Sequence, residues 1–384
     1  MRILFVSTSS GSRGGGELYL VFLGQALAKR GHTVGLWCSS HSRMDELATQ
    51  FSEFGTVLRS RYINTYDHKL RSFRYLLPSS LSECRQKWEK FQPDLIHLNK
   101  QNLEDGLDLL KLVQQLPYPK VATIHITQSA SSLGAFLGGG RDFIAQRALQ
   151  NFSGTLIAIS QTRSRNLSNF LGNNHQAPKV KTIENGVYIP TAEEREAKRQ
   201  QARSQLGIAN NQLLIIAVGR MEEQKRPLLF LEWAKSLKSL LPTAKFLWVG
   251  DGRTAPAWDA WVKENNADSY IQRLGWQKDV TLYLAAADAF FHPAQFEGLP
   301  FALLEAMAWC LPCFITPSLA TELSFPEGVC AIVKENDYQS LKILTEPTQR
   351  YALGKKGHQL VQEQFSRDKM VEQYEALYSE RQLP

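Results

Sequence analysis

The densest group of side chains suited to chemistry lies between residues 291 and 307. It contains two carboxylates, Glu297 and Glu305, which are separated by seven residues. Gly298 lets the backbone approach a ligand, and Pro300 suits the first position of a helix, where its missing N–H is not needed. The free amides at that helix start favour an anion. Glu297 in the loop and Glu305 on the helix can therefore contact two parts of one extended ligand.

Glu305 is surrounded in the sequence by apolar residues, so we expect it to be at least partly buried. A buried carboxylate needs hydrogen-bond donors, and the hydroxyl groups of a ribose would supply them. An incidental Glu on the polar face of a helix is the alternative.

Two cations follow the apolar run Leu213–Val218, which is typical of a buried strand. Arg220 comes directly after Gly219, and Lys225 follows five residues later, just before Arg226-Pro227. Cations at the carboxyl end of a strand, close to a helix start, suit a diphosphate.

The segment from Ser7 to Glu17 is rich in glycine, with Gly15 and Gly16 just before a predicted helix. Its backbone can approach a phosphate or a sugar at the positive end of that helix. The glycines do not follow the G-x-G-x-x-G pattern, and the second predicted strand lacks the acidic residue that binds ribose in dinucleotide sites. A dehydrogenase is therefore disfavoured, while a purely structural tight turn stays an alternative.

Short apolar runs alternate with amphipathic stretches along the chain, which predicts an α/β fold with parallel sheets. The first series of predicted strands comprises Ile3–Val6, Val34–Cys38, Leu95–Leu98, Val121–Ile124, Leu156–Ile159 and Val180–Glu184. The second series comprises Leu213–Val218, Phe246–Val249, Ile271–Leu274, Ala289–His292, Cys313–Thr316 and Val329–Val333. Two consecutive series predict two doubly wound domains joined near residues 185–190, and the charged stretch Thr191–Gln205 predicts a surface helix that opens the second.

Positive charge is concentrated in the first half of the chain. Residues 1–184 contain 22 Lys and Arg against 13 Asp and Glu, whereas residues 185–384 contain 22 against 24. The excess is densest from Arg59 to Lys90, a segment that includes Tyr66, Lys69, Arg71 and Arg74. Such a segment suits an anionic acceptor, a lipid surface or nucleic acid, with a solvated face as the alternative. No nucleic-acid-binding motif accompanies it, so we do not expect nucleic acid as a partner.

The composition predicts a globular protein of the reducing cytoplasm. The chain has 384 residues, and its apolar start, Met1–Val6, is too short for the core of a signal peptide. Its five cysteines are few and odd in number, and the CxxC pair Cys310 and Cys313 lacks a second pair for zinc. We expect core or loop thiols and a cytoplasmic location, with peripheral contact at the inner face of the membrane through the basic first half as one option.

These motifs follow one another in an order that resembles the retaining glycosyltransferases of family 4. The order comprises the glycine-rich first loop, the turn Asn185-Gly186-Val187, the Arg220 and Lys225 pair and the E-x7-E pair. The resemblance implies the GT-B fold, with two facing Rossmann-like domains, parallel sheets and an interdomain cleft. It implies an acceptor-binding domain at 1–185, a nucleotide-sugar-binding domain at 186–365 and a C-terminal helix within 366–384 that crosses back to the first domain.

The resemblance also implies roles for single residues. Arg220 and Lys225 would grip the donor diphosphate, together with amides near Gly298 and Leu299. Glu297 would bind hydroxyls of the donor sugar, and Glu305 would bind the nucleotide ribose.

Further contacts implied by the resemblance come from both domains. His125 resembles the family's histidine near the transferring centre, and Gly15 and Gly16 would close over the phosphates or the sugar. The base pocket would be lined by Gly250, Gly275 and Trp276. The chain departs from the family pattern at two positions, Tyr188 and Ile126, where family members often have Asp. These departures concern the interdomain and acceptor contacts.

The implied reaction moves a hexosyl group from a nucleoside-diphosphate sugar to a hydroxyl of a glycan or glycolipid acceptor, as in bacterial lipopolysaccharide or polysaccharide synthesis. No metal or other cofactor is expected, because the chain has no DxD motif and this fold class usually needs none. Retention through a covalent carboxylate intermediate stays open, and attack on the departing group's own face is favoured. A nucleotide-sugar epimerase of the same fold and a non-catalytic sugar-nucleotide-binding protein are the alternatives.

Overall fold

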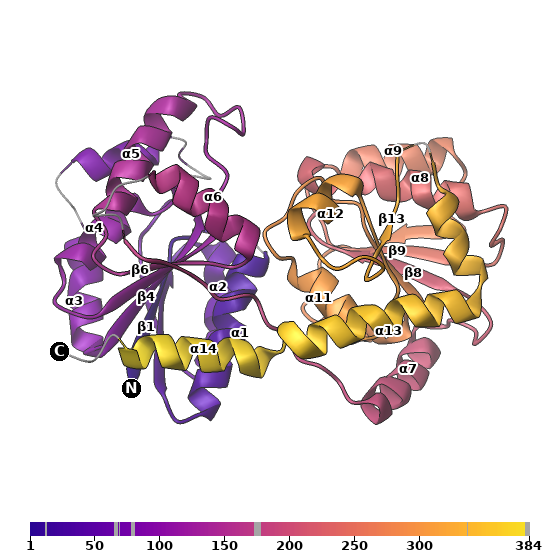
Figure 1. Cartoon of the computed structure of the whole chain (residues 1–384), viewed down its shortest axis with the longest axis horizontal. Coiled ribbons are helices and arrows are strands. Elements are labelled where there is room, and N and C mark those ends of the chain that lie inside the picture. The colour runs from indigo at the N-terminus through magenta and orange to yellow at the C-terminus, as the bar shows by residue number, and fades with distance from the viewer. Residues whose placement is uncertain are drawn as a thin grey trace. The chain divides into compact units, whose positions relative to one another are not determined.

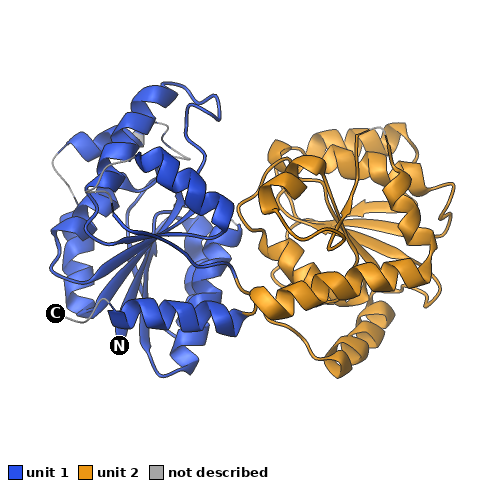
Figure 2. Ribbon diagram, viewed as in Figure 1, with its two compact units in different colours: residues 1–185, 367–384 blue, residues 186–366 orange. Residues whose placement is uncertain are grey.

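The computed structural model of the chain describes residues 1–11, 14–64, 68, 70–77, 81–172, 178–335 and 337–380, without the side chain of Arg71. Ser12 and Arg13 of the first loop, and Tyr66 and Lys69 of the basic segment, lie outside the described residues. The chain divides into two compact units, residues 1–185 with 367–384 and residues 186–366 (Figure 2).

Unit 1 is built on a seven-stranded parallel sheet in the order β3-β2-β1-β4-β5-β6-β7, with helices on both of its faces (Figure 1). Its strands are β1 Arg2–Ser7, β2 Thr33–Ser39, β3 Thr56–Ser60, β4 Leu95–Asn102, β5 Lys120–Ile126, β6 Thr155–Ala158 and β7 Val180–Thr182. Its helices are α1 Gly15–Lys29, α2 Asp45–Ser52, α3 Ser82–Phe91, α4 Leu107–Gln115, α5 Gly138–Gln150, α6 Gln161–Leu171 and α14 Arg367–Glu380, with short 3-10 turns η1 Ser42–Met44 and η2 Arg71–Leu76.

Unit 2 is built on a six-stranded parallel sheet in the order β10-β9-β8-β11-β12-β13. Its strands are β8 Leu214–Val218, β9 Lys245–Val249, β10 Ile271–Arg273, β11 Ala289–His292, β12 Cys313–Ile315 and β13 Ala331–Ile332. Its helices are α7 Ala192–Leu206, α8 Pro227–Leu237, α9 Ala255–Glu264, α10 Thr281–Ala286, α11 Phe301–Ala308, α12 Pro317–Leu323 and α13 Pro347–Gln364, with 3-10 turns η3 Glu223–Lys225 and η4 Gln339–Thr345.

The prediction of an α/β fold with two parallel-sheet, Rossmann-like domains is confirmed. The prediction omitted β3, which lies at the edge of the first sheet and pairs only with β2. Its middle residues are half-buried, so it lacks the continuous apolar run that marks a central parallel strand. Across the described residues, no helix combines the length and the apolar character that crossing a bilayer requires.

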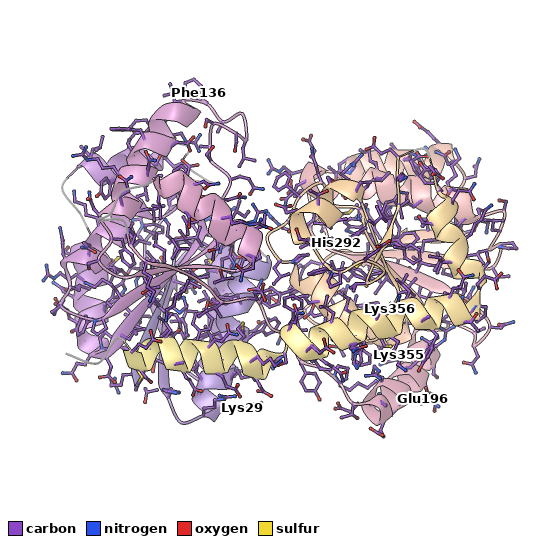
Figure 3. The ribbon with its side chains drawn as sticks, viewed as in Figure 1. Lys29, Phe136, Glu196, His292, Lys355 and Lys356 are labelled. Atoms are coloured by element: carbon purple, nitrogen blue, oxygen red, sulfur yellow. The ribbon has the colours of Figure 1, made fainter. Side chains whose placement is uncertain are left out.

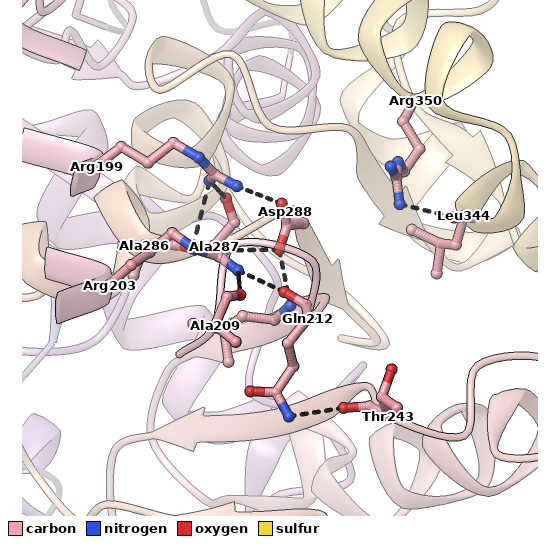
Figure 4. Close-up of polar contacts among 11 residues, drawn as sticks. Arg199, Arg203, Ala209, Gln212, Thr243, Ala286, Ala287, Asp288, Leu344 and Arg350 are labelled. Atoms are coloured by element: carbon pink, nitrogen blue, oxygen red, sulfur yellow. Dashed lines mark hydrogen bonds and ion pairs between the residues drawn. The ribbon is translucent and has the colours of Figure 1, made fainter. Parts of the chain in front are cut away.

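Helix α7 is fastened to the amino end of the second sheet by Asp288, the residue just before β11 (Figure 4). Arg199 Nη2 donates to Asp288 Oδ1 at 2.5 Å, and Arg203 Nη1 donates to Asp288 Oδ2 at 3.0 Å. The same Oδ2 accepts the backbone N–H of Leu214 at 2.8 Å, which joins α7 to the start of β8. These ion pairs therefore lie at the amino ends of the strands, whereas the cations that follow β8 lie beyond its carboxyl end.

Helix α14 is anchored to unit 1 by a buried network of tyrosine, histidine and threonine. The hydroxyl of Tyr378 lies 2.6 Å from His97 Nδ1, and His97 Nε2 lies 2.8 Å from Thr123 Oγ1. The hydroxyl of Tyr374 lies 3.1 Å from the same threonine oxygen. Burial lowers the pKa of His97 to about 3, so the imidazole is neutral at physiological pH.

We expect unit 1 to lose stability on mild acidification. Burial holds the pKa of His97 at about 3 and that of His125 at about 4, whereas both bind a proton below about pH 6.5 when unfolded. The unfolded state therefore binds more protons, and the free energy of unfolding falls as the pH drops from about 6.5 to about 4, by up to about 1.4 kcal/mol per pH unit for each histidine.

Thermal midpoints between these pH values measure this effect. His97→Gln should flatten the pH dependence while lowering stability at neutral pH, because the amide does not bind a proton in this pH range. If the thermal midpoints of wild type and His97→Gln fell equally with pH, His97 would not be a cause of the loss of stability in acid.

Candidate functional site

An ion pair lies beyond the carboxyl ends of β8 and β11 in unit 2. Lys225 Nζ contacts Glu297 Oε1, and His292 Nε2 lies 3.7 Å from the same oxygen. The side chains of Lys225, Glu297 and His292 are only 16%, 13% and 3% exposed. Burial acts to raise the pKa of Glu297, but the Lys225 ammonium and the histidine outweigh it and lower the pKa to about 2. Glu297 is therefore an ionised carboxylate at neutral pH, suited to accept hydrogen bonds.

Two hydrogen bonds to backbone carbonyls hold the loop of Glu297 against the segment of Lys225. The backbone N–H of Gln295 donates to the Gln224 carbonyl at 2.8 Å, and Gln224 Nε2 donates to the Phe296 carbonyl at 2.8 Å. Both contacts involve the residues next to the ion pair. The pairing of Lys225 with Glu297 thus rests on the surrounding backbone as well as on charge.

Arg220 is separated from the end of β8 by Gly219 alone, at a point where the segments that follow β8, β9 and β10 come close together. A Cβ at Gly250, whose φ is 143°, would lie 2.0 Å from the Gly219 carbonyl oxygen, so only glycine fits. The N–H of Gly250 donates to the Gly275 carbonyl at 2.8 Å, which joins the end of β9 to the turn after β10. Arg220 is half-buried, and its guanidinium has no hydrogen-bond or ion-pair partner among the residues that the structure describes.

Lys225 and Arg220 lie near one another at this edge. A Cβ at Gly219 would lie 3.7 Å from Cδ and Cε of Lys225, so the lysine stem packs beside the residue that precedes Arg220. Trp276 follows Gly275 in the turn after β10 and is partly exposed. Within unit 2 the structure thus gathers the predicted residues Arg220, Lys225, Glu297, Gly250 and Gly275 at the carboxyl edge of one sheet.

Helix α11 starts one residue later than predicted. Pro300 has φ −75° and ψ 121°, so it is extended and caps the helix, and Phe301 is the first helical residue. The assignment of Pro300 to the first helical position is therefore wrong. Gly298 and Leu299 are buried ahead of the cap, and Glu305 on the helix is half-buried, in agreement with the sequence pattern.

In unit 1, His125 and Gly16 are joined by Asn99, a fully buried residue of β4. His125 Nε2 lies 2.7 Å from Asn99 Oδ1, and Asn99 Nδ2 donates to the Gly16 carbonyl at 2.9 Å. Burial lowers the pKa of His125 to about 4, so its imidazole is neutral at physiological pH. Gly15 begins α1, so the glycine-rich loop and His125 lie at the same edge of the first sheet.

Asn99 and His292 were not predicted as site residues. Both are fully or nearly buried polar residues within strands, and a polar residue inside an apolar strand was the available signal. Within the described part of the chain, no three His, Cys, Asp or Glu side chains are grouped in a way that could hold a metal ion.

Two family descriptions match consecutive parts of the chain. Glycosyltransferase Family 4 matches residues 13–189, and Glycosyl transferases group 1 matches residues 198–375.

Curated relatives are similar over part of their length. The Escherichia coli UDP-Gal:alpha-D-GlcNAc-diphosphoundecaprenol alpha-1,3-galactosyltransferase is 33% identical over 141 residues, which is 36% of this chain and 36% of that protein. The lipopolysaccharide 1,6-galactosyltransferase of Escherichia coli K12 is 36% identical over 108 residues, or 26% of this chain and 28% of that protein. The chain thus aligns with about a third of the length of these relatives.

Solved structures share the fold over nearly the whole chain. Anabaena HepE in complex with UDP-glucose has a TM-score of 0.75 at 20% identity and covers 99% of this chain and 100% of that one. WaaG, a glycosyltransferase involved in lipopolysaccharide biosynthesis, has a TM-score of 0.71 at 16% identity and covers 98% and 99%. With two consecutive family matches and this GT-B fold, the chain belongs to the glycosyltransferases of family 4.

Proposed function

We propose that this chain transfers a hexosyl group from a nucleoside-diphosphate sugar to a hydroxyl of a glycan or glycolipid acceptor, with retention of anomeric configuration. The observation that carries the proposal is the buried pair of Lys225 and Glu297 beside Arg220, at the carboxyl edge of the second sheet. Ligands of open α/β sheets bind outside the carboxyl ends of the strands.

Arg220 and Lys225 would stabilise the departing diphosphate. Breaking the bond between the sugar and the phosphate leaves growing negative charge on the diphosphate and oxocarbenium character on the sugar. Two cations held in a largely buried site oppose that negative charge more effectively than water does, because they need no reorganisation during the reaction. We include no metal ion in the reaction, since these side chains supply the positive charge.

Glu297 would orient the donor sugar. Its low pKa keeps the carboxylate ionised, which suits an acceptor of hydrogen bonds from sugar hydroxyls and not a proton donor. The acceptor would then attack on the face from which the diphosphate departs, with a diphosphate oxygen taking its proton. A covalent bond to Glu297 is the second route to retention.

The relatives support the donor and acceptor classes. One is named for transfer of galactose from UDP-Gal to a diphosphoundecaprenol-linked sugar, and another for lipopolysaccharide galactosylation. HepE has been solved with UDP-glucose. We therefore propose a UDP-hexose as donor and a lipid-linked or polysaccharide acceptor of bacterial envelope synthesis.

A product assay tests the function. The chain is incubated with UDP-glucose or UDP-galactose and a lipid-linked GlcNAc acceptor, with and without EDTA, and both UDP release and the anomeric configuration of the product are measured. We expect acceptor-dependent UDP release, an α-linked product and equal rates with EDTA. Interconversion of the two sugar nucleotides without UDP release would identify an epimerase, and binding without turnover would identify a sugar-nucleotide-binding protein.

Glu305→Ala is expected to weaken UDP binding about tenfold or more, because a hydrogen bond to a charged group contributes about 1.5 to 3 kcal/mol. Isothermal titration calorimetry with UDP measures the change, and Glu264→Ala on the exposed surface of α9 is the matched control. Equal UDP affinity in both variants would remove Glu305 from the donor site.

A further inference from the structure

The side chain of Asn99 joins three elements at the carboxyl edge of the first sheet. Asn99 lies on β4 and is fully buried. Its Nδ2 donates to the Gly16 carbonyl in the first turn of α1 at 2.9 Å, and its Oδ1 lies 2.7 Å from Nε2 of His125 on β5. The backbone N–H of Thr8, directly after β1, donates to the Asn99 carbonyl at 3.1 Å. Both the backbone and the side chain of Asn99 are therefore held in place.

The Gly16 carbonyl decides how the Asn99 amide is oriented. A carbonyl oxygen only accepts hydrogen bonds, so the part of the amide that faces Gly16 is the NH2 group. The reverse orientation would place two acceptor oxygens against each other without a proton between them. The amide oxygen of Asn99 therefore faces His125.

The amide oxygen in turn decides which nitrogen of His125 carries the proton. Burial lowers the pKa of His125 to about 4, so the imidazole is neutral at physiological pH and has one N–H and one bare nitrogen. Because Asn99 Oδ1 accepts, Nε2 carries the proton. Nδ1 keeps its lone pair, and it has no hydrogen-bond partner among the residues that the structure describes.

The imidazole ring of His125 is also held by packing. The Tyr19 ring on α1 lies edge to face against it, with ring centroids 5.1 Å apart and an angle of 78° between the ring planes. A Cβ at Gly16 would overlap the Gln101 side chain, so the absence of a side chain at residue 16 lets α1 lie close to β4. His125 is only 6% exposed as a result.

The amide partner distinguishes His125 from a buried histidine of unit 2. His292, labelled in Figure 3, lies 3.7 Å from the carboxylate of Glu297. A carboxylate favours the charged imidazolium, which carries a proton on both nitrogens and accepts no hydrogen bond. The Asn99 amide is uncharged and accepts the Nε2 proton without favouring that form. His125 therefore keeps one accepting nitrogen.

We propose that Asn99 is a positioning residue that fixes His125 as the Nε2–H tautomer, so that Nδ1 accepts a hydrogen bond from a sugar hydroxyl. A bare nitrogen binds only a hydrogen-bond donor, and hydroxyl groups are the donors that a sugar supplies. In this tautomer Nδ1 has no proton to give, so His125 orients a sugar and does not protonate the departing group. The identity of the ligand rests on the proposed function, whereas the tautomer follows from the contacts of Asn99 alone.

Nitrogen NMR of the full chain with isotope-labelled histidine tests the tautomer, because it shows which ring nitrogen carries the proton. We expect the His125 proton on Nε2, exchanging slowly with solvent, and His125→Gln identifies these signals by their absence. In Asn99→Leu, which has no acceptor, the Nδ1–H form should appear and the Nε2 proton should exchange about tenfold faster. Thr123→Val is the matched control, since it removes the buried contact between Thr123 and His97 and should leave the His125 signals unchanged.

Sugar transfer tests the role of the tautomer. Asn99→Leu should lower the rate of transfer by about tenfold, which is the usual effect of losing one hydrogen bond between uncharged groups. Its affinity for UDP should equal that of wild type, because UDP lacks the transferred sugar. Acceptor-free hydrolysis of the donor should fall by the same factor if the hydroxyl belongs to the transferred hexose, and should be unchanged if it belongs to the acceptor. Thr123→Val should keep wild-type rates.

Several results would overturn the proposal. One is a wild-type spectrum with the His125 proton on Nδ1, and another is folded Asn99→Leu with the tautomer and proton exchange of wild type. A third is an equal loss of transfer in Thr123→Val, since general loosening of the core would then explain both variants. A fourth is folded Asn99→Leu that transfers sugar at the wild-type rate.

Thermal midpoints show whether the variants are folded. If Asn99→Leu does not fold, the wild-type spectrum still decides the tautomer, and the smaller change Asn99→Ala replaces it in the assays. A wild type that transfers no sugar would count against the proposed function, whereas the spectra would still show whether Asn99 sets the tautomer of His125.

Discussion

Lys225→Ala is expected to lower the turnover of sugar transfer by about a hundredfold or more, which is the usual cost of losing one group that stabilises charge in a transition state. The ammonium of Lys225 lies in a largely buried site beside Arg220, where its charge would oppose that of the departing diphosphate. Because this charge develops as the bond breaks, the loss should affect kcat more than the KM for the donor.

Steady-state transfer and acceptor-free donor hydrolysis measure the effect of Lys225→Ala. Lys263→Ala, on the exposed surface of α9, removes the same charge from unit 2 and should keep wild-type rates. Thermal midpoints of both variants show whether a loss of activity reflects a loss of folding. The site assignment fails if folded Lys225→Ala turns over donor at the wild-type rate.

Glu297→Gln is expected to impair both stability and transfer. Replacing the carboxylate by an amide leaves the Lys225 ammonium largely buried without its counter-charge, and breaking a buried ion pair costs about 3 kcal/mol. Transfer should fall by about a hundredfold, as for other losses of transition-state contacts, because the amide accepts hydrogen bonds from sugar hydroxyls more weakly than a carboxylate does.

The pH dependence of stability gives a second signature of Glu297. Its folded pKa of about 2 lies below the unfolded value of about 4.3, so the carboxylate stabilises the folded state above about pH 4.3. That contribution is lost as the pH falls from about 4.3 to about 2. The free energy of unfolding of Glu297→Gln should not show this decrease between about pH 4.3 and about pH 2.

A double variant separates the structural from the chemical role of the pair. Lys225→Met with Glu297→Leu removes both buried charges and should recover much of the stability that Glu297→Gln loses, since an apolar pair can replace a buried ion pair. Transfer should stay low in the double variant. Recovery of both properties would show that the pair serves only the fold.

The sequence was sufficient to predict the fold class and the positions along the chain of almost all strands. Buried parallel strands have continuous apolar runs, and such runs are a property of neighbouring residues. The edge strand Thr56–Ser60 was missed because an edge strand needs less apolar surface. The start of α11 was misplaced by one residue, because the ψ angle that makes Pro300 a cap is not visible in the residue type.

Only the tertiary structure decided which side chains meet. Lys225 and Glu297 are 72 residues apart in sequence, and their contact depends on β8 and β11 being neighbours in the sheet. The link from His125 to Asn99 arises in the same way, because β5 and β4 are neighbours in the first sheet. The local sequence pattern indicates which residues are buried and whether a segment forms a helix or a strand. Contacts across a sheet depend on the order of its strands, which the local pattern does not determine.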